Sequence, residues 1–322
     1  MQYRRLGKTG CHVSEIGFGA WGIGKSFWVG ARDEESIAAL HAAIDAGVNF
    51  IDTALAYGQG HSESLVGCVV RARSERVYVA TKVSPLNQHW PALPGDRLQE
   101  AFPPSYIIES TEESLRHLGL DCIDLQQLHV WRDEWLRDES WLEALQQLKE
   151  EGKIRAIGVS INDHEPESAL QVVQSGVVDA VQVIYNIFDQ SPTRALFAAC
   201  LKHEVGVIAR CPFDEGSLTG MVTSQTTFPE GDWRNDYFRD ERKAMVENRL
   251  APIKAYLGAE ARTLPELALR FCLSHPVVST VIPGMRTCRH VLDNVAVSDG
   301  RSLSEGLLTS LKRQAWERNF YD

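Results

Sequence analysis

The sequence predicts one α/β barrel spanning residues 1–322, in which eight parallel strands alternate with eight main helices. Short apolar runs of β-type residues alternate with amphipathic helical segments along nearly the whole chain. Three successive predicted strands lead to an ionisable side chain at their C-terminal ends, namely Asp52, Lys82 and His129. Barrel enzymes carry their chemistry at these strand ends, and 322 residues is a suitable length for one such barrel.

The predicted elements begin with a hairpin over residues 3–16, which we place at the bottom of the barrel. The long loops 84–102 and 211–257, the second with an extra helix, are expected at the C-terminal face. The strands are predicted at residues 16–19, 48–52, 77–82, 122–129, 154–159, 179–185, 205–210 and 277–283. The main helices are predicted at residues 34–46, 63–72, 103–119, 140–151, 166–175, 192–203, 264–274 and 287–297.

A doubly wound open sheet is the alternative fold for such a pattern. It would carry a glycine-rich GxGxxG turn after the first strand, and none is present. The candidate reactive residues also come from several strand ends rather than from one switch point. No repeat, low-complexity stretch or linker divides the chain, so we expect a single domain.

The composition of the chain argues against several classes of function. The net charge of −10 argues against general binding to nucleic acid or to an anionic membrane. The seven cysteines are scattered without a CxxC pair, which is typical of a reducing cytoplasm and of neither a disulfide scaffold nor a zinc site. The chain shows no signal-peptide pattern and no run of transmembrane length. We therefore expect a cytoplasmic protein without a metal, and the oligomeric state stays open.

Asp52, Tyr57, Lys82 and His129 form a set suited to proton transfer. A tyrosine has an ordinary pKa of about 10, and a neighbouring lysine ammonium is expected to lower it. Asp52 would keep the lysine charged and oriented, while a neutral His129 could position a carbonyl oxygen. Such a set can protonate the oxyanion that forms when hydride reaches a carbonyl carbon. None of these residues can supply hydride, so a redox cofactor is required.

Five motifs in this order resemble the aldo-keto reductase superfamily: FIDTALAYGQGHSESLVG, VYVATK, DLQQLH, IRAIGVS and VQVIYN. The resemblance extends from Tyr3 to about Asp299. It implies an α/β barrel and metal-free, NAD(P)H-dependent reduction of an aldehyde, ketone or sugar carbonyl to an alcohol. It also implies that Tyr57 is the general acid, that Lys82 and Asp52 tune it, and that His129 orients the carbonyl.

The resemblance further implies the cofactor contacts. Ser160 and Gln182 match residues that hold the nicotinamide carboxamide, whereas Ile161 stands where asparagine is usual and Asn162 is the candidate replacement. Cys211 takes a position that is usually aromatic. Backbone amides of residues 213–218 are expected to bind pyrophosphate, with the site formed by Phe213, Gly216, Ser217 and Leu218.

The segment after the last strand is expected to bind the adenosine end of the cofactor, because it opens a helix whose N-terminus favours phosphate. The resemblance implies that its contacts are Gly284, Arg286, His290 and Asn294, with His290 in place of a usual glutamine. Arg286 would pair with a 2′-phosphate, which favours NADP, with NAD as the alternative.

Trp21, Trp90 and Trp131 lie in loops expected at the barrel mouth and are candidates for lining a pocket for a small carbonyl substrate. The loop 221–240 could fold over the cofactor as a lid. Two alternative functions stay open: an NAD(P)-dependent sugar dehydrogenase, and a cofactor-binding regulatory subunit similar to channel-associated members of the superfamily. A metal-dependent hydrolase is disfavoured, because no clustered histidine and aspartate ligands occur at the strand ends.

Overall fold

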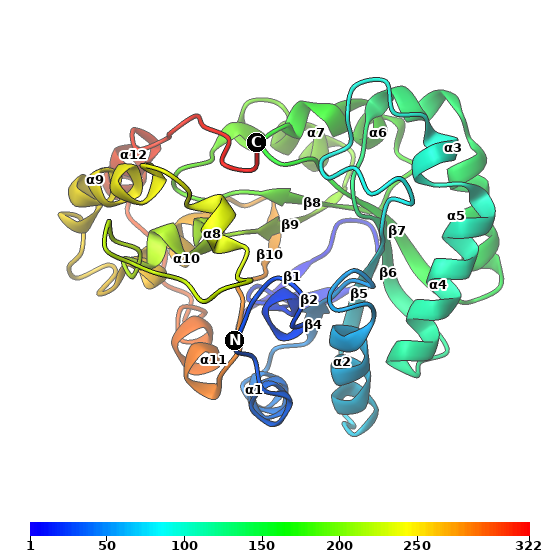
Figure 1. The fold of residues 1–322 in the computed structure, drawn as a ribbon, viewed down its shortest axis with the longest axis horizontal. Helices are drawn as coiled ribbons and strands as arrows, with labels where there is room; N and C mark the ends of the chain where they lie inside the picture. Colours follow the sequence, from blue (N-terminus) through cyan, green and yellow to red (C-terminus); the bar gives the residue numbers. More distant parts are fainter.

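Eight parallel strands form a closed barrel surrounded by helices (Figure 1) in the computed structural model, which describes all residues 1–322. Neighbours in sequence are neighbours in the sheet, and the bridges Ile16–Val281 and Gly19–Gly284 join the first strand to the last. At this seam a Cβ atom on Gly19 would lie 2.7 Å from the Ile282 carbonyl oxygen, so closure requires glycine. The strands are β3 (Phe18–Gly19), β4 (Phe50–Asp52), β5 (Tyr78–Val83), β6 (Ile123–Leu128), β7 (Ile154–Ser160), β8 (Ala180–Ile184), β9 (Gly206–Arg210) and β10 (Val278–Val281). The predicted barrel is confirmed.

The main helices follow the predicted segments closely. They are α1 (Asp33–Asp45), α2 (His61–Arg71), α4 (Pro104–Leu118), α5 (Ser140–Glu150), α6 (Leu170–Ser175), α7 (Leu196–Lys202), α10 (Leu264–Leu273) and α11 (Cys288–Val295). The first turns expected of α6 and α7 are instead separate 3₁₀ turns, Pro166–Ala169 and Ser191–Thr193, each with a proline in its first two positions. The long loops contain α3 (Leu98–Ala101), α8 (Arg234–Tyr237) and α9 (Arg242–Lys254).

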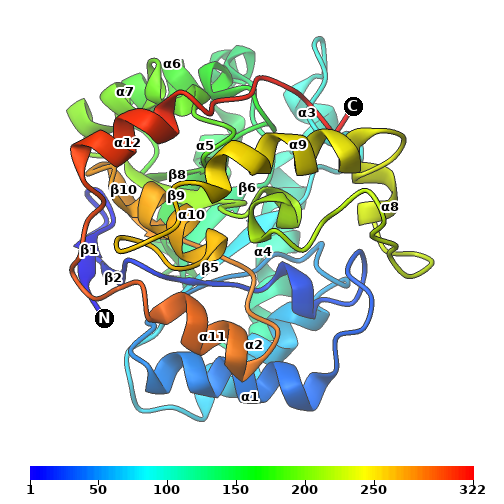
Figure 2. The same ribbon diagram turned by 90° about the vertical axis from the view of Figure 1, so that its left-hand side faces the viewer.

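One helix, α12 (Glu305–Lys312), was not predicted from the sequence. Its start is capped by Ser304, whose side chain accepts a hydrogen bond from the Leu307 backbone. Leu311 is buried, and Leu307 and Leu308 are partly buried against the core, so one face of this short helix is apolar. The chain after it runs alongside α9 to the C-terminus (Figures 1 and 2).

The N-terminal hairpin pairs β1 (Tyr3–Arg5) with β2 (His12–Ser14). Leu6 and Val13 pack against apolar side chains inside the barrel, including Phe50 at the start of β4. Figure 2 shows the hairpin at one end of the barrel and α8 at the other. The hairpin therefore covers the N-terminal end of the barrel, as the sequence predicted.

The barrel interior changes from apolar to polar along the strands. Six strands contribute one residue each to an apolar layer: Phe50, Ala80, Leu125, Ala156, Ala180 and Ile208. Side chains two residues apart on a strand share a face. Two residues later, the same six strands carry Asp52, Lys82, Gln127, Gly158, Gln182 and Arg210. We call this second set the polar layer; it lies at the C-terminal ends of the strands and forms the floor of the candidate site.

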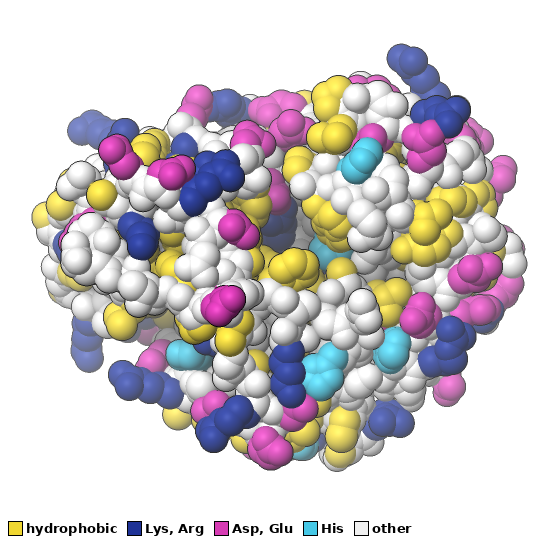
Figure 3. Space-filling model, viewed as in Figure 1, with side chains coloured by type: hydrophobic (Ala, Val, Ile, Leu, Met, Phe, Trp, Pro, Cys, Tyr) yellow, Lys and Arg dark blue, Asp and Glu magenta, His cyan; other side chains and the backbone are white.

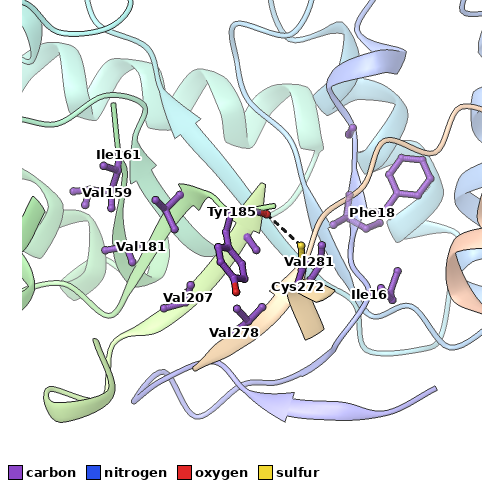
Figure 4. Close-up of a cluster of buried hydrophobic side chains, with 14 of the residues drawn as sticks. Ile16, Phe18, Val159, Ile161, Val181, Tyr185, Val207, Cys272, Val278 and Val281 are labelled. Atoms are coloured by element: carbon purple, nitrogen blue, oxygen red, sulfur yellow. Dashed lines mark hydrogen bonds between the residues drawn. The ribbon is translucent and has the colours of Figure 1, made fainter. Parts of the chain in front are cut away.

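The main core fills the space between the outer face of the strands and the helices. Figure 4 shows part of it, with Val159, Val181 and Val207 from three strands packed in one cluster. The Cys272 thiol within this cluster donates a hydrogen bond to the Tyr185 carbonyl oxygen at 3.2 Å. The buried thiol therefore has a hydrogen-bond partner. None of the helices combines the length and the apolar character that a membrane crossing requires.

Candidate active site

Lys82 is the centre of the candidate site. Its fully buried Nζ atom donates to Asp52 Oδ2 at 2.6 Å, to the Thr53 carbonyl oxygen at 2.7 Å and to the Tyr57 hydroxyl oxygen at 3.2 Å. The three donors of an ammonium group are thereby all used. Asp52 ends β4 and Tyr57 lies in the loop that follows, so the parallel pairing of β4 with β5 brings both groups to Lys82.

His129 follows the last residue of β6 and faces two aromatic rings. Its ring centroid lies 5.8 Å from that of Tyr57 and 4.5 Å from that of Trp90. Its Nδ1 atom is buried and has no hydrogen-bond partner. Burial, together with the charges of Lys82 and Arg210, holds the pKa of His129 well below 6.5. The imidazole is therefore neutral at physiological pH.

The hydroxyl group of Tyr57 lies among buried groups, although the residue as a whole is only half-buried. Burial, with the Asp52 carboxylate as the next contribution, raises the pKa of Tyr57 well above 10. The net pKa of Tyr57 is thus raised, and the stabilisation of its phenolate by Lys82, 3.2 Å away, stays a prediction. Burial also lowers the pKa of Lys82, and Asp52 opposes that effect. At neutral pH Tyr57 is a phenol with a proton to donate.

Asp52 is held by three neighbours in the polar layer. Its Oδ2 atom binds Lys82, while its Oδ1 atom accepts hydrogen bonds from Gln182 Nε2 at 2.7 Å and from Gln127 Nε2 at 3.4 Å. Gln182 and Gln127 are both buried and also contact one another. Asp52 cannot rotate without losing these bonds, so the direction of Lys82 is fixed as well.

The mouth of the barrel is a hollow with hydrophobic side chains around its rim and basic and histidine side chains inside it (Figure 3). Trp21 lies 6.2 Å from Tyr57 between ring centroids, and Trp90 is 43% exposed beside His129. Both positions suit the predicted role in lining a substrate pocket.

Trp131 lies elsewhere, and its assignment to the substrate pocket is corrected. Its side chain is completely buried among Trp135 and Trp141, with ring centroids 5.8 and 4.8 Å away. Its Nε1 atom donates to Asp133 at 3.0 Å, so its polar group is satisfied inside the protein. Trp131 packs the core behind the mouth and has no surface for a substrate.

Ser160 and Gln182 are paired residues on neighbouring strands β7 and β8, as expected for residues that could hold one ligand group together. Asn162, the candidate replacement for the usual asparagine, is hydrogen-bonded to other parts of the protein. Its amide exchanges two hydrogen bonds with the Ala92 backbone, at 3.1 and 3.3 Å, and also donates to Glu165. In this structure Asn162 holds the loop that carries Trp90, and Ile161 is buried in the core.

Cys211 directly follows β9, and its thiol lies 3.6 Å from Nη1 of Arg210 in the polar layer. The backbone of Cys211 is left-handed, with φ of 51°, and its thiol donates to Glu215 Oε1 at 3.0 Å. The preceding residue, Arg210, is the one that shares the inward face of β9 with Ile208. The Tyr321 hydroxyl of the C-terminal tail donates to the same Glu215 oxygen at 2.9 Å.

The buried carboxyl group of Glu215 predicts a pH-dependent stability. Burial raises the pKa of Glu215 from 4.5 to about 6. Because the folded state holds the proton more tightly, stability is lost as pH rises from about 4.5 through about 6. We expect Glu215→Gln to raise the free energy of unfolding by about 2 kcal/mol at about pH 8 and by very little at about pH 4. Denaturant unfolding at both pH values measures this, and an equal gain at both would contradict it.

The expected pyrophosphate loop is a tight turn, Asp214–Thr219, in which Glu215 and Gly216 have φ of 54° and 104°. Phe213 and Gly216 are partly exposed, whereas Ser217 and Leu218 are buried. The Ser217 Oγ atom has no hydrogen-bond partner. Asp214 is paired with Arg318 of the C-terminal tail, which offsets an acidic charge next to the proposed phosphate site.

The segment after β10 places Gly284 at the barrel seam and Asn294 on the buried side of α11. Thr287 caps α11 by accepting from the His290 backbone, and the His290 side chain is exposed. Arg286 is partly buried and donates from Nη1 to the Val29 carbonyl oxygen at 3.1 Å. Gly284, Arg286 and His290 thus lie around the start of α11, whereas Asn294 lies near its C-terminal end.

The loop 221–240 lies against the first loop of the barrel. The Trp233 backbone donates to the Phe27 carbonyl oxygen at 3.0 Å, and its ring lies 5.5 Å from Trp21. Tyr321 stacks on Trp233 with ring centroids 5.5 Å apart. The loop and the C-terminal tail therefore border the mouth together, in the position expected of a lid.

A nicotinamide cofactor fits the residues that are present. The buried polar atoms at the mouth that have no partner in the protein include His129 Nδ1, Arg210 Nε and Ser217 Oγ. Unpaired buried polar atoms are costly, and a polar ligand would satisfy them. Ser160 and Gln182 would hold the nicotinamide end, and Arg286 would face the adenosine end.

Three contributors to the site were missed from the sequence: Gln127, Arg210 and Tyr321. The first two could have been found by counting two residues forward from each apolar residue of the inner layer. Tyr321 has no such signal, because it follows an unpredicted helix and approaches the site only in the folded chain.

Comparison with known proteins gives a consistent result. The model of the Aldo/keto reductase family matches residues 15–312. The NADH-specific methylglyoxal reductase of Escherichia coli (strain K12) is 30% identical over 321 residues, covering 96% of this chain and 97% of that protein. The glycerol dehydrogenase structure from Gluconobacter oxydans has a TM-score of 0.76 at 28% identity, covering 97% and 94% of the two chains. A Klebsiella pneumoniae aldo/keto reductase in complex with NADP and acetate has a TM-score of 0.70 at 26% identity, covering 99% and 98%.

Proposed function

The chain belongs to the aldo/keto reductase family, and on that premise we propose that it is an NADP-dependent reductase of small aldehydes, ketones or sugar carbonyls with Tyr57 as its general acid. The observation that carries this proposal is the contact of Lys82 Nζ with both Asp52 at 2.6 Å and Tyr57 at 3.2 Å. A buried ammonium between a carboxylate and a phenol is arranged to stabilise the phenolate that proton donation leaves behind.

In the proposed mechanism, the protein donates one proton to the substrate, and NADPH would supply the hydride when bound. The neutral His129 imidazole donates a hydrogen bond to the carbonyl oxygen and positions it. Tyr57 transfers its phenolic proton to that oxygen as negative charge develops there. Lys82 stabilises the resulting phenolate, and Asp52, fixed by Gln182, keeps Lys82 charged and directed at Tyr57.

The choice of NADP over NAD rests on Arg286. Its guanidinium is partly buried, and a 2′-phosphate offers it a charge-assisted pair that NAD lacks. The Klebsiella pneumoniae relative is described with NADP and the Escherichia coli relative as NADH-specific, so both preferences occur among similar proteins. The residue at the helix start is what favours NADP here.

Cofactor binding and carbonyl turnover by the wild type test this proposal. We expect NADPH to bind about tenfold more tightly than NADH, and to support reduction of simple aldehydes. Arg286→Gln is expected to abolish the preference. Arg289→Gln is the matched control, because Arg289 lies three residues further on, in the first turn of α11, with a side chain that is 88% exposed. Equal affinity for both cofactors in the wild type would refute the preference, and binding of neither would refute the proposed function.

The similarity to a glycerol dehydrogenase favours a second candidate, alcohol or sugar oxidation by the same residues. That direction requires Tyr57 as a phenolate, and burial raises its pKa. Oxidation should therefore gain strongly with rising pH, whereas reduction uses the phenol present at neutral pH. Initial rates in both directions across pH separate the two, and cofactor binding without turnover in either direction would favour a regulatory subunit.

A further inference from the structure

A second cation, Arg210, lies partly buried at the barrel mouth and has no part in the proposed proton transfer. It ends β9 and belongs to the polar layer that also holds Asp52, Lys82 and Gln182. Its side chain is only 17% exposed. Its Nη2 atom donates to the Asp163 carboxylate and to the Ile161 carbonyl oxygen at 3.1 Å. The guanidinium is thus fixed in place by the loop after β7.

Arg210 keeps hydrogen-bonding capacity that the protein does not use. A guanidinium has five N–H donors. The buried Nε atom has no partner, and Nη1 makes one weak contact, with Cys211 Sγ at 3.6 Å. A charged group that is held on one side and unpaired on the other is positioned to meet a ligand.

The charge of Arg210 reaches the reacting groups. It contributes to lowering the pKa of His129 and of Lys82, after the larger effect of burial in each case. Only one carboxylate, that of Asp163, hydrogen-bonds Arg210 directly, since Glu215 is engaged by Cys211 and Tyr321. The mouth therefore carries two cations, Lys82 and Arg210, with one bonded carboxylate for each.

We propose that Arg210 makes this site bind the reduced nicotinamide in preference to the oxidised one. The oxidised ring carries a positive charge and the reduced ring is neutral, so a fixed cation beside the ring repels only the oxidised form. This inference rests on the proposed function, because it needs a nicotinamide ring at the polar layer. In the direction of carbonyl reduction, it speeds the exchange of oxidised for reduced cofactor after each turnover.

The test is the ratio of two dissociation constants, that of NADP⁺ divided by that of NADPH, measured by calorimetric titration at one fixed salt concentration. Arg210→Gln is expected to lower this ratio about tenfold. Asp163→Asn removes the carboxylate that offsets the arginine, and is expected to raise the ratio. Two variants of one ion pair thus shift one quantity in opposite directions, which a general loosening of the site would not do.

Two controls separate local charge from other effects. Arg210→Lys keeps the charge and should leave the ratio near that of the wild type. Arg155→Gln removes an arginine near the N-terminal end of β7, two strands away from β9, where its side chain is 61% exposed, and should also leave the ratio unchanged.

The outcomes are distinguishable. If Arg210→Gln binds both forms with the wild-type ratio, the inference is wrong and the proposed function stands. If Arg210→Gln does not fold, Asp163→Asn decides alone, and an unchanged or lowered ratio in that variant overturns the inference. If the wild type binds neither form, the proposed function has failed and the inference fails with it.

Discussion

Tyr57→Phe is expected to lower the turnover number for aldehyde reduction by about 10³-fold while leaving the dissociation constant for NADPH unchanged. The variant removes one oxygen atom and keeps the ring that packs 6.2 Å from Trp21 and 5.8 Å from His129. Lys82 loses one of its three acceptors but keeps Asp52 and the Thr53 carbonyl oxygen. The site should therefore stay assembled without a proton donor.

Single-turnover reduction with saturating NADPH measures this loss directly. Tyr78→Phe is the matched control, since Tyr78 begins β5 at the opposite end from Lys82 and should leave turnover unchanged. A variant that retains about half of the wild-type rate would show that another group supplies the proton. The assignment of Tyr57, and with it the proposed mechanism, would then be wrong.

The barrel could be predicted because each βα unit has a recognisable sequence pattern of its own. Apolar runs of four to eight residues alternate with helical periodicity, and parallel strands joined by helices admit few topologies. Helix α12 was not predicted because it is only two turns long and follows the eighth strand and helix, although Leu307, Leu308 and Leu311 give it an apolar face. The 3₁₀ turns at Pro166 and Pro192 likewise depend on local geometry that helical periodicity does not distinguish.

The convergence of Asp52, Tyr57, Lys82 and His129 was predictable from the same topology, because the ends of parallel strands meet at one face. What failed was the direction in which neighbouring side chains point. Trp131 follows β6 by three residues and turns into the core. The Cys211 thiol donates to Glu215, and the predicted cofactor contact of Cys211 stays a prediction. A one-residue change of phase reverses the face of a strand, so Arg210 was overlooked next to Cys211.

Lys82→Met is expected to lower both the stability of the protein and its turnover. The substitution leaves Asp52, which is 2% exposed, without the cation that it binds at 2.6 Å. Removing one partner of a buried ion pair typically costs about 3–5 kcal/mol, because the remaining charge stays dehydrated. We expect a loss of that size in the free energy of unfolding, and turnover reduced at least as much as in Tyr57→Phe.

The double variant Asp52→Asn with Lys82→Met separates the two roles of the lysine. Asparagine keeps an oxygen that can accept the hydrogen bond from Gln182. Its side chain carries no charge, so most of the lost stability should return. Turnover should stay low, because the phenolate of Tyr57 would still have no ammonium at 3.2 Å to stabilise it. Denaturant unfolding and single-turnover rates of the same preparations give both quantities. Recovery of activity along with stability would mean that Lys82 supports the fold alone, and the chemistry assigned to it would have to be abandoned.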